Sequence, residues 1–424
     1  QGRILGSITM MDLAALYPTL CGMSGTIVPS ERELHDFYGR RTAIVPPNRP
    51  CIREDLPDLV YTHADAKWAA VAGAVEEARR AGRPVLVGTA SVEESERLAG
   101  MLRQAGIGCS VLNARNDEEE ASIVAEAGAP GAVTVSTNMA GRGTDIRLGG
   151  SDGRDRGRVV QAGGLHVIGT SRFASRRIDD QLRGRAGRQG DPGSSRFMVS
   201  LEDEMMVRFG LAGRVPRRWR GARRAEPVGD ERIGEKIAVT QRIVEGQNLD
   251  ARRTLFRYSS FVEKQRRAWQ ARRQEALLAE GDMGRIERLA TLHHMDALWE
   301  EHLARIASLR DGIHLRRMGG RDPVQEFSRE ALEMYEAMEE ELEARVAETM
   351  ERAAGAGGHG AAGIEARELR GPSSTWTYLV SDRAHDWKTS LGDMGNVGMG
   401  IATGLYFGPI FMAQALYRWI AGKR

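Results

Sequence analysis

Val85-Leu86-Val87-Gly88 is a short apolar run with two β-branched residues, and Ser91 and Glu94 follow it at the spacing of a capping box. The run predicts a buried strand, and the box predicts the start of a helix that ends near Ala105-Gly106. A second apolar run, Cys109-Ser110-Val111-Leu112, comes soon after that helix. A strand, a capped helix and another strand in this order predict a βα unit with parallel strands.

The same alternation extends from Lys67 to Ser200. We predict strands at 132–136, 165–168 and 195–199, a helix at about 118–127 and a helix that begins near Ser175. Strands and helices that alternate in this way are typical of a parallel sheet. The sequence therefore predicts a RecA-like α/β domain.

The composition changes after Met206. An arginine-rich connector spans residues 214–224, and the long charged stretches that follow carry no strand signal. Apolar residues recur there at three- and four-residue steps in two sets, namely Leu292, Met295, Trp299, Leu303, Ile306 and Leu309, and then Phe327, Ala331, Met334, Met338, Leu342 and Val346. Gly319-Gly320-Arg321-Asp322-Pro323 separates the sets, which predicts an antiparallel hairpin of two helices. The predicted fold class is α/β plus all-α.

Composition limits the classes of protein and partner. The 424 residues exceed what one core usually holds, so we expect two or three structural units. The formal net charge of +2 does not indicate nucleic acid or an acidic membrane surface. Cys21, Cys51 and Cys109 are isolated, which fits a reducing cytosol and predicts no metal site. The chain opens on Gln1 without an initiator methionine or a signal peptide, and we expect it to be part of a longer protein.

The C-terminal part has a composition of its own. Residues 353–363 are rich in glycine and alanine and predict a flexible linker. Residues 397–417 contain no charged residue, and basic residues follow them. This pattern fits a helix that spans or enters a bilayer, but several glycines dilute its apolarity. A helix at the membrane interface or packed on protein is an equal alternative.

The stretch Gln181-Leu182-Arg183-Gly184-Arg185-Ala186-Gly187-Arg188-Gln189-Gly190-Asp191 carries the most informative chemical pattern. Arg185 and Arg188 are three residues apart, so on a helix or a tight turn their guanidinium groups can point the same way. Such fixed charges stabilise the negative charge on a transferred γ-phosphoryl group, as an arginine finger does. A solvated basic helix end would explain the arginines but not the interleaved glycines, which permit a ligand to approach the backbone.

A second segment, Thr137-Asn138-Met139-Ala140-Gly141-Arg142-Gly143-Thr144-Asp145-Ile146, directly follows a predicted strand. Sheets of this class bind ligands beyond the carboxyl ends of their strands. We expect Gly141 and Gly143 to let backbone amides approach a ligand, Arg142 to couple nucleotide state to a neighbouring domain, and Asp145 to accept hydrogen bonds from a ribose or an adenine edge. Taken alone, the segment also fits an ordinary βα turn.

A third segment, Leu20-Cys21-Gly22-Met23-Ser24-Gly25-Thr26, lies near the start of the chain. The hydroxyls of Ser24 and Thr26 would bridge a nucleotide site to the rest of a motor. A plain turn fits the segment equally well.

Together and in this order, the three segments resemble the second half of a superfamily 2 helicase-type motor, and they resemble the SecA preprotein translocase family more closely than any helicase. The resemblance covers about residues 1–350. The strings that also carry it are Pro47-Asn48-Arg49-Pro50, Val244-Glu245-Gly246-Gln247-Asn248 and the stretches 55–61, 84–89, 163–170, 296–303 and 312–316.

The resemblance implies an ATP-driven motor that moves unfolded preproteins through a Sec-type membrane channel. It implies five regions: the end of a first nucleotide-binding domain with a linker (1–60), a second RecA-like nucleotide-binding domain (61–212), a long-helix scaffold with a two-helix finger (230–352), the linker (353–395) and the apolar tail (396–424). It further implies catalytic roles for Arg185 and Arg188, and polypeptide contact at the finger by Arg316 and Met318. The nucleotide-binding set would be Gly141, Arg142, Gly143, Thr144, Asp145 and Gln181.

The implied cofactors are ATP and Mg²⁺, with the Mg²⁺ ligands in an N-terminal part that this chain lacks. The implied partners are a SecY-type channel complex, unfolded preproteins and anionic membrane lipids, with a homodimer as an open option and no nucleic acid. The implied location is the bacterial cytoplasm and the cytoplasmic face of the inner membrane, with an embedded tail as the alternative.

The sequence also departs from the family pattern. It contains no GxxxxGK[ST] phosphate loop, and Asp230-Glu231 lacks the apolar strand of a Walker B pair, so we expect this chain to be unable to hydrolyse ATP alone. Met318 stands where SecA fingers typically carry an aromatic residue. The stretch between about Arg273 and Leu289 is too short for the helical wing domain, and the Cys-rich zinc tail is absent. Both absences suggest an accessory or divergent SecA.

Two other classes of protein stay open. A superfamily 2 nucleic-acid helicase shares the motor segments, and the arginines of 214–224 would serve to track a strand. The finger-like strings, however, have no reason to occur in a helicase. A binding module that has lost its catalytic half is the non-enzymatic alternative.

Overall fold

The structure is a computed structural model that describes residues 6–112, 120–137, 143–213, 215–219, 223–279, 284–313, 315, 320, 322–355 and 369. The chain divides into two compact units, Gln1–Glu348 and Thr349–Arg424. The described part of the second unit consists of the end of the last helix and Leu369.

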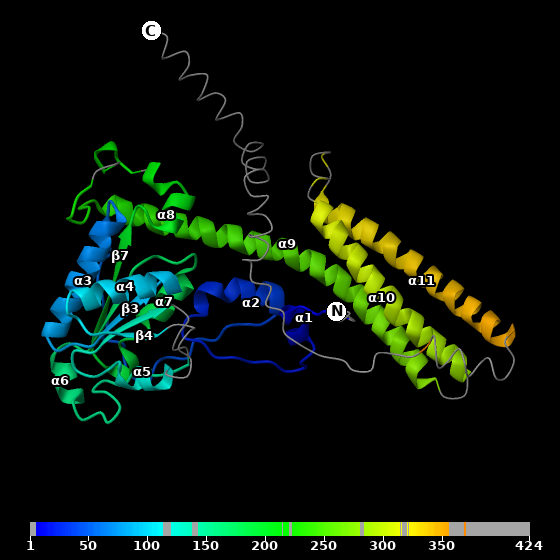
Figure 1. Ribbon diagram of the computed structural model, residues 1–424, viewed down its shortest axis with the longest axis horizontal. Helices are drawn as coiled ribbons and strands as arrows, with labels where there is room; N and C mark the ends of the chain where they lie inside the picture. The colour runs from blue at the N-terminus through cyan, green and yellow to red at the C-terminus, as the bar shows by residue number, and fades with distance from the viewer. Residues whose placement is uncertain are drawn as a thin grey trace, which may run out of the picture. The chain divides into compact units, whose positions relative to one another are not determined.

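Parallel strands form one seven-stranded sheet in the described part of the first unit (Figure 1). They are β1 (Glu54–Asp55), β2 (Leu59–Tyr61), β3 (Val85–Thr89), β4 (Ser110–Leu112), β5 (Val133–Thr137), β6 (Leu165–Gly169) and β7 (Gly193–Ser200). Their order in space is β1-β7-β6-β3-β5-β4, and β2 pairs with the C-terminal half of β7. This confirms the parallel sheet and the strands that were predicted from residue 85 onward.

Two strands were not predicted. β1 is a pair of charged residues and β2 is three residues long, so neither forms a recognisable apolar run. Both pair with β7, β1 with Ser194 and Ser195 and β2 with residues 198–200. The sheet therefore includes residues from Glu54 onward, although the predicted domain begins at residue 61.

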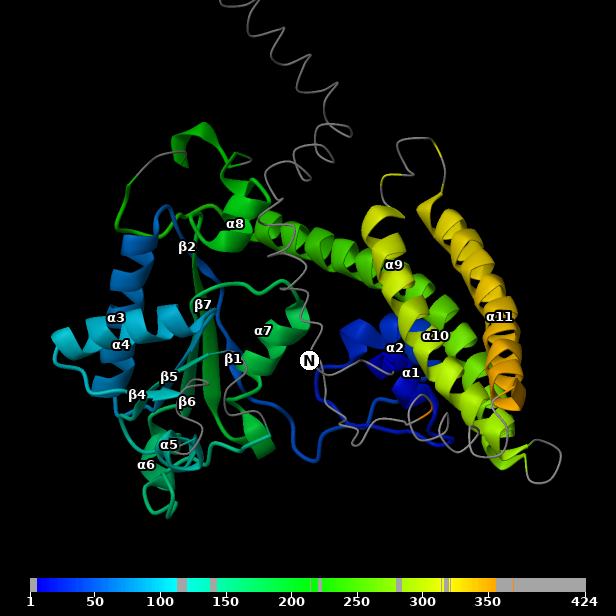
Figure 2. The same ribbon diagram turned by 45° about the vertical axis from the view of Figure 1, so that its right-hand side comes forward.

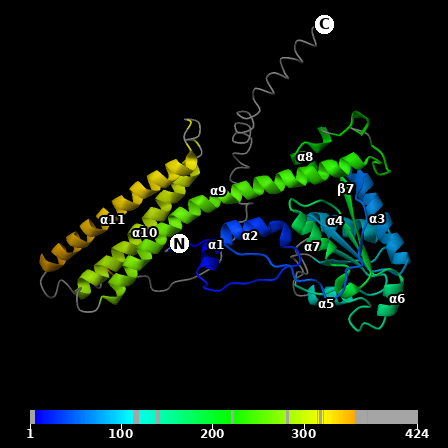
Figure 3. The same cartoon turned by 180° about the vertical axis from the view of Figure 1, so that it is seen from behind.

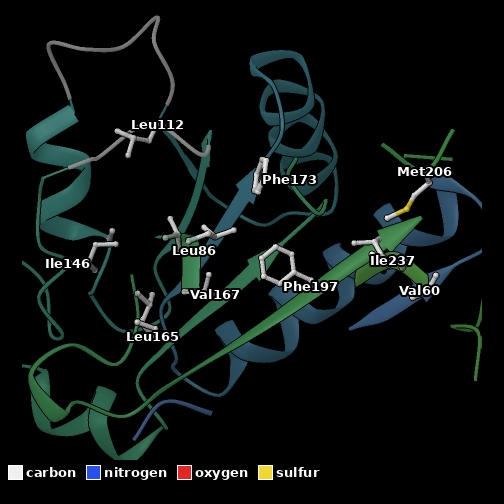
Figure 4. Packing of buried hydrophobic residues seen from close by; sticks show 14 of the residues in the cluster. Val60, Leu86, Leu112, Ile146, Leu165, Val167, Phe173, Phe197, Met206 and Ile237 are labelled. Carbon is white, nitrogen blue, oxygen red and sulfur yellow. The ribbon is translucent and has the colours of Figure 1, made fainter. Parts of the chain in front are cut away.

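Helices cover both faces of the sheet. On one face lie α3 (Ala64–Arg80) and α4 (Val92–Gln104), whose Val71, Val75, Leu98 and Leu102 cluster with Val85 and Val87. On the other lie α5 (Glu120–Glu126), α6 (Arg156–Gln161) and α7 (Arg176–Arg183), whose Val124, Val159 and Leu182 cluster with Leu86, Val167 and Phe197 (Figure 4). Leu86 and Val87 face opposite sides because the side chains of a strand alternate.

Local signals account for the helix starts. Ser91 Oγ accepts a hydrogen bond from Glu94 N at 3.2 Å, as the capping box predicts, while the Glu94 carboxylate accepts from Ala90 N at 3.0 Å. α5 corresponds to the helix predicted at about 118–127. α7 begins one residue after Ser175, which is its N-cap.

Shorter elements flank this domain. Before it come α1 (Met10–Ala15), η1 (Val28–Ser30) and α2 (Glu31–Tyr38). Between α7 and the long helices come η3 (Arg188–Gly190), α8 (Glu204–Arg208), η4 (Leu211–Gly213) and η5 (Arg217–Trp219).

Long helices make up the rest of the described chain (Figure 3). They are α9 (Glu231–Leu278), α10 (Arg285–Gly312) and α11 (Pro323–Gly355). The predicted apolar sets of α10 and α11 meet, and α9 adds a third helix to the predicted hairpin through Trp269 and Tyr258. The Trp269 ring lies 6.4 Å from that of Trp299, and the Tyr258 ring lies 4.7 Å from that of Phe327. Residues 279–284 alone connect α9 to α10, which leaves no room for a further domain there.

No helix within the described ranges is both long enough and apolar enough to cross a membrane. The first residues of the predicted linker, 353–355, are the end of α11, because the helix continues past the predicted boundary at 352. The rest of the linker, apart from Leu369, and the apolar tail at 397–417 lie outside the described residues.

A polar pair is buried between the long helices. His302 Nε2 donates to Gln265 Oε1 at 3.0 Å, and Gln265 Nε2 donates to the Ala331 carbonyl at 2.8 Å. Burial lowers the pKa of His302 from 6.5 to about 4, with a smaller contribution from Arg305. The folded helices therefore favour the neutral imidazole.

We predict that the helical part loses stability as pH falls from 7 to 5. Because the folded pKa of His302 lies below the unfolded value, its contribution is complete above pH 6.5 and is lost as pH falls towards 4. The loss between pH 7 and 5 should be about 2 kcal/mol for this one group. Urea unfolding followed by tryptophan fluorescence should show a smaller pH dependence for His302→Gln than for the wild type. An equal pH dependence in the two proteins would contradict this role of His302.

Candidate functional site

The arginine segment is a turn that follows α7. The helix ends at Arg183, and Gly187 and Gln189 then adopt left-handed backbone conformations, with φ of 72° and 51°. Arg185 and Arg188 consequently lie beyond the helix, and they do not share one helical face. Figure 2 shows α7 on the side of the sheet that faces α2. The tight-turn alternative of the prediction is thus the one observed.

Arg188 connects this turn to the second predicted segment. Its Nη1 donates to the Thr144 carbonyl at 3.1 Å and to Asp145 Oδ1 at 2.8 Å, while its Nε donates to the Gly184 carbonyl at 3.0 Å. The side chains of Arg188 and Asp145 are 37% and 56% exposed. An ion pair this exposed contributes only about 0–1 kcal/mol, so an anionic ligand can replace it at little cost.

Gln181 connects the same helix to the third predicted segment. Its Nε2 donates to Thr26 Oγ1 at 3.3 Å, and the Thr26 amide donates to Ser24 Oγ at 3.2 Å. α7 and its following turn therefore contact both other segments. The structure thus brings the three segments together, although each of them also fits an ordinary turn when taken alone.

The Arg188–Asp145 pair does not lie where sequence reasoning expected it. Ala186 and Gly187 abut Gly193, the first residue of β7, and Asp191 pairs with Arg156 at the start of α6. These contacts place the turn beside the amino ends of β6 and β7, not beyond the carboxyl ends of the strands. The reason is that α7 runs antiparallel to the strands and ends at their opposite edge. The second segment starts at the carboxyl end of β5. Gly149, three residues after the segment, donates a hydrogen bond to the Gly128 carbonyl, which precedes β5, so the chain has returned to the amino end of that strand.

Residues 49–53, which precede β1, pack against the arginine turn, and the sequence did not predict this contact. Arg53 donates to the Ala186 carbonyl at 3.2 Å and to both oxygens of Asp55 at 2.8 and 2.9 Å. The hydrogen bonds from Arg53 lower the pKa of Asp55, which also accepts from Ser195 Oγ at 2.6 Å. Residues 49–53 lie more than 130 positions before the turn, so no local pattern announces the contact.

The remaining predicted site residues divide into two groups. Arg185 is half-buried, Thr144 contributes its carbonyl, and Gly143 is exposed with φ of 81°. Gly141, Arg142, Arg316 and Met318 lie outside the described residues.

These features define the class of the protein. The parallel sheet covered by helices on both faces fits the predicted RecA-like α/β domain, and it is joined here to three long helices. A partly exposed arginine and an exposed aspartate lie on two of its turns. A family model described as the SecA P-loop domain matches residues 50–155 and 151–216. A second model, described as the SecA wing and scaffold domain, matches residues 278–354.

Curated relatives agree with both models. The chain is 44% identical over 407 residues to "Protein translocase subunit SecA 2" of Thermobifida fusca (strain YX), across 90% of this chain and 52% of the relative. It is 41% identical over 418 residues to the protein of the same name in Mycolicibacterium smegmatis (strain ATCC 700084 / mc(2)155), with the same two coverages. The chain belongs to the SecA family, and it spans about half the length of the curated relatives that it matches.

Solved structures show a weaker likeness. The DEAD-box protein SrmB of E. coli, in its crystal structure with the regulator of ribonuclease activity A, is 22% identical, with a TM-score of 0.30. The match covers 42% of this chain and 98% of that one. A likeness of this size carries no argument about function.

We predict that Gly187→Ala destabilises the RecA-like domain more than Gly210→Ala does. A Cβ on Gly187 would lie 2.6 Å from Arg53 Cβ, whereas a Cβ on Gly210 meets nothing within 4 Å. Both glycines have positive φ, 72° and 63°, so each alanine should lose about 1–2 kcal/mol to the left-handed backbone. The collision at Gly187 should add about 1–3 kcal/mol. Equal shifts in melting temperature for the two variants would mean that the turn is not packed on residues 49–53.

Proposed function

We propose that this chain is the part of an ATP-driven SecA-type translocase that supplies its second nucleotide-binding domain and its helical finger. The translocase would use ATP hydrolysis to move unfolded preproteins through a Sec-type membrane channel. The observation that carries the proposal is the contact of Arg188 with Thr144 and Asp145, on a helix whose Gln181 reaches Thr26.

The residues of this chain fit one half of an ATP site that lies between two domains. They would supply the half that comes from the second domain. Arg188 offers an exposed guanidinium, which pairs well with phosphate oxygens, and its bond to Asp145 is weak enough to exchange. Bound ATP with Mg²⁺ supplies the free energy of γ-phosphate transfer. Arg188 and Arg185 would stabilise charge there, while Gly141, Arg142, Gly143, Thr144, Asp145 and Gln181 would hold the nucleotide and position the turn.

The phosphate-binding loop and the Mg²⁺ ligands would come from another part of the full-length protein. The sequence contains no GxxxxGK[ST] motif, and the chain matches about half of its relatives' length. We therefore propose that this chain alone does not hydrolyse ATP.

The proposed partners and domain limits follow from the family. A SecY-type channel, unfolded preproteins and anionic lipids would bind the full-length protein at the cytoplasmic face of the inner membrane, where the finger residues Arg316 and Met318 would meet the polypeptide. A homodimer and an embedded tail are further proposals. The domain limits at residues 61–212 and 230–352 also remain proposals, with the sheet extended to Glu54.

We predict that Arg188→Ala in the full-length protein abolishes the ATPase activity that channel-containing vesicles and an unfolded secretory substrate stimulate. The loss in kcat should be ~10³-fold or more, because the guanidinium would act on the transferred phosphoryl group. Arg80→Ala is the matched control, since that arginine lies on α3 with its side chain 75% exposed.

Stimulation by RNA or DNA in place of the vesicles would instead support the helicase alternative. An Arg188→Ala protein that retains the full stimulated rate would contradict the proposed catalytic role.

A further inference from the structure

The long helix α9 caps the first turn of α7. Arg176, the first residue of α7, donates its backbone N–H to Glu245 Oε1 at 2.6 Å, while the N-cap residue Ser175 makes no capping bond with its own side chain. The first N–H groups of a helix have no partner within the helix, so an outside acceptor stabilises its start. The acceptor here comes from a helix that lies far along the chain.

Gln241 lies one helical turn before Glu245, and its buried side chain also contacts the start of α7. Its Nε2 donates to the Phe173 carbonyl and to Asp179 Oδ2, both at 2.8 Å, and the residue is 3% exposed. Residues four apart share one face of a helix, so Gln241 and Glu245 form a two-point contact with the start of α7. Both neighbours of the amide nitrogen are acceptors, so no other side chain of similar shape satisfies them.

The contact includes a buried charge pair. The Asp179 carboxylate is fully buried and also accepts from Arg172 Nη1 at 2.8 Å and from the Phe173 amide at 3.1 Å. Arg172 binds both oxygens of Asp58 at 2.8 Å. Its guanidinium stacks over the Phe197 ring at 4.3 Å, while that of Arg183, at the other end of α7, lies 4.9 Å from the same ring.

α7 connects this contact with the arginine turn. The helix has eight residues, which is about 12 Å at 1.5 Å per residue, and it ends at Arg183, shortly before Arg185 and Arg188. Leu182 is buried in the core, so the helix does not bend freely. The turn that carries Arg188 is therefore held at two places, by α7 on one side and by Arg53 on the other.

The same long helix also contacts α2. Arg253 pairs with Asp36 of α2 at 2.6 Å, Arg252 pairs with Glu33, and the rings of Phe37 and Phe256 lie 5.3 Å apart. α2 follows Thr26, the partner of Gln181, after a few residues. α9 thus contacts both the start of α7 and the helix α2 that follows Thr26.

We propose that Gln241 is a positioning residue for Arg188: it fixes the start of α7 on α9, and so sets where the arginine turn lies. This inference rests on the proposed function, because the catalytic role of Arg188 is part of that proposal. Displacement of α9 then changes the position of Arg188 through α7, without any contact between α9 and the nucleotide.

The test compares full-length wild type with Gln241→Ala, Gln241→Glu and the control Gln247→Ala, which changes an exposed glutamine on the same helix. Gln241→Glu keeps the length of the side chain but replaces the donating amide by a carboxyl group that faces Asp179, so it disrupts the polar contact while it preserves the packed volume. We expect both Gln241 variants to lose ~10- to ~100-fold in stimulated kcat, the range expected for a catalytic group displaced by about 1 Å. The KM for ATP should stay within about threefold of wild type, since Gln241 does not touch the nucleotide.

A second measurement does not depend on activity. Amide hydrogen exchange of the 181–191 segment should accelerate in the Gln241 variants and not in Gln247→Ala. If Gln241→Ala does not fold, Glu245→Ala at a half-buried position provides the same comparison.

The outcomes separate the two proposals. Wild-type rates and wild-type exchange in Gln241→Glu would overturn the positioning role, even where Arg188→Ala abolishes activity. A wild type without stimulated ATPase, or full activity in Arg188→Ala, would overturn the proposed function. The exchange of residues 181–191 would still decide whether Gln241 sets the position of the turn.

Discussion

The buried pair of Asp179 and Arg172 is the constraint on which the arrangement of this chain depends. A carboxylate without exposure is tolerated only when a counter-charge and hydrogen bonds surround it, and removal of one partner of such a pair typically costs about 3–5 kcal/mol. Although burial opposes its charge, Asp58 and Asp179 raise the pKa of Arg172. Through this pair, the linker between β1 and β2, the start of α7 and the long helix α9 meet at one point.

The candidate site has the opposite character. Arg188 is partly exposed and Asp145 is exposed, and they are weakly paired, whereas Gly187 of the same turn is tightly packed against Arg53. Such a packed turn suits Arg188. It keeps the arginine in position for a ligand, and little free energy is lost when Arg188 exchanges Asp145 for that ligand. The buried Asp179 lies in α7, and the partly exposed Arg188 lies on the turn that follows the same helix.

Sequence reasoning recovered the elements with strong local patterns. The structure confirms the strands β3, β5 and β6, the capping box at Ser91 and the apolar sets of α10 and α11. These were predictable because burial imposes a characteristic spacing of apolar residues on strands and on helices. Sequence reasoning missed β1 and β2, whose pairing with β7 rests on the partner strand. The sequence placed the second segment beyond the carboxyl ends of the strands, whereas Asp145 meets Arg188 on a turn beside the amino ends of β6 and β7, because α7 runs antiparallel to the strands.

What the sequence by itself determined was the class of fold, the membership in the SecA family and the positions of the three segments that are proposed to form the site, since local spacing and residue type mark them. Only the tertiary structure decided that Arg188 meets Thr144 and Asp145, that Gln181 meets Thr26 and that Gln241 holds Asp179. These contacts join residues from 43 to 155 positions apart. Polar side chains at such distances leave no periodic signal, and their partners follow from how the helices pack around the sheet.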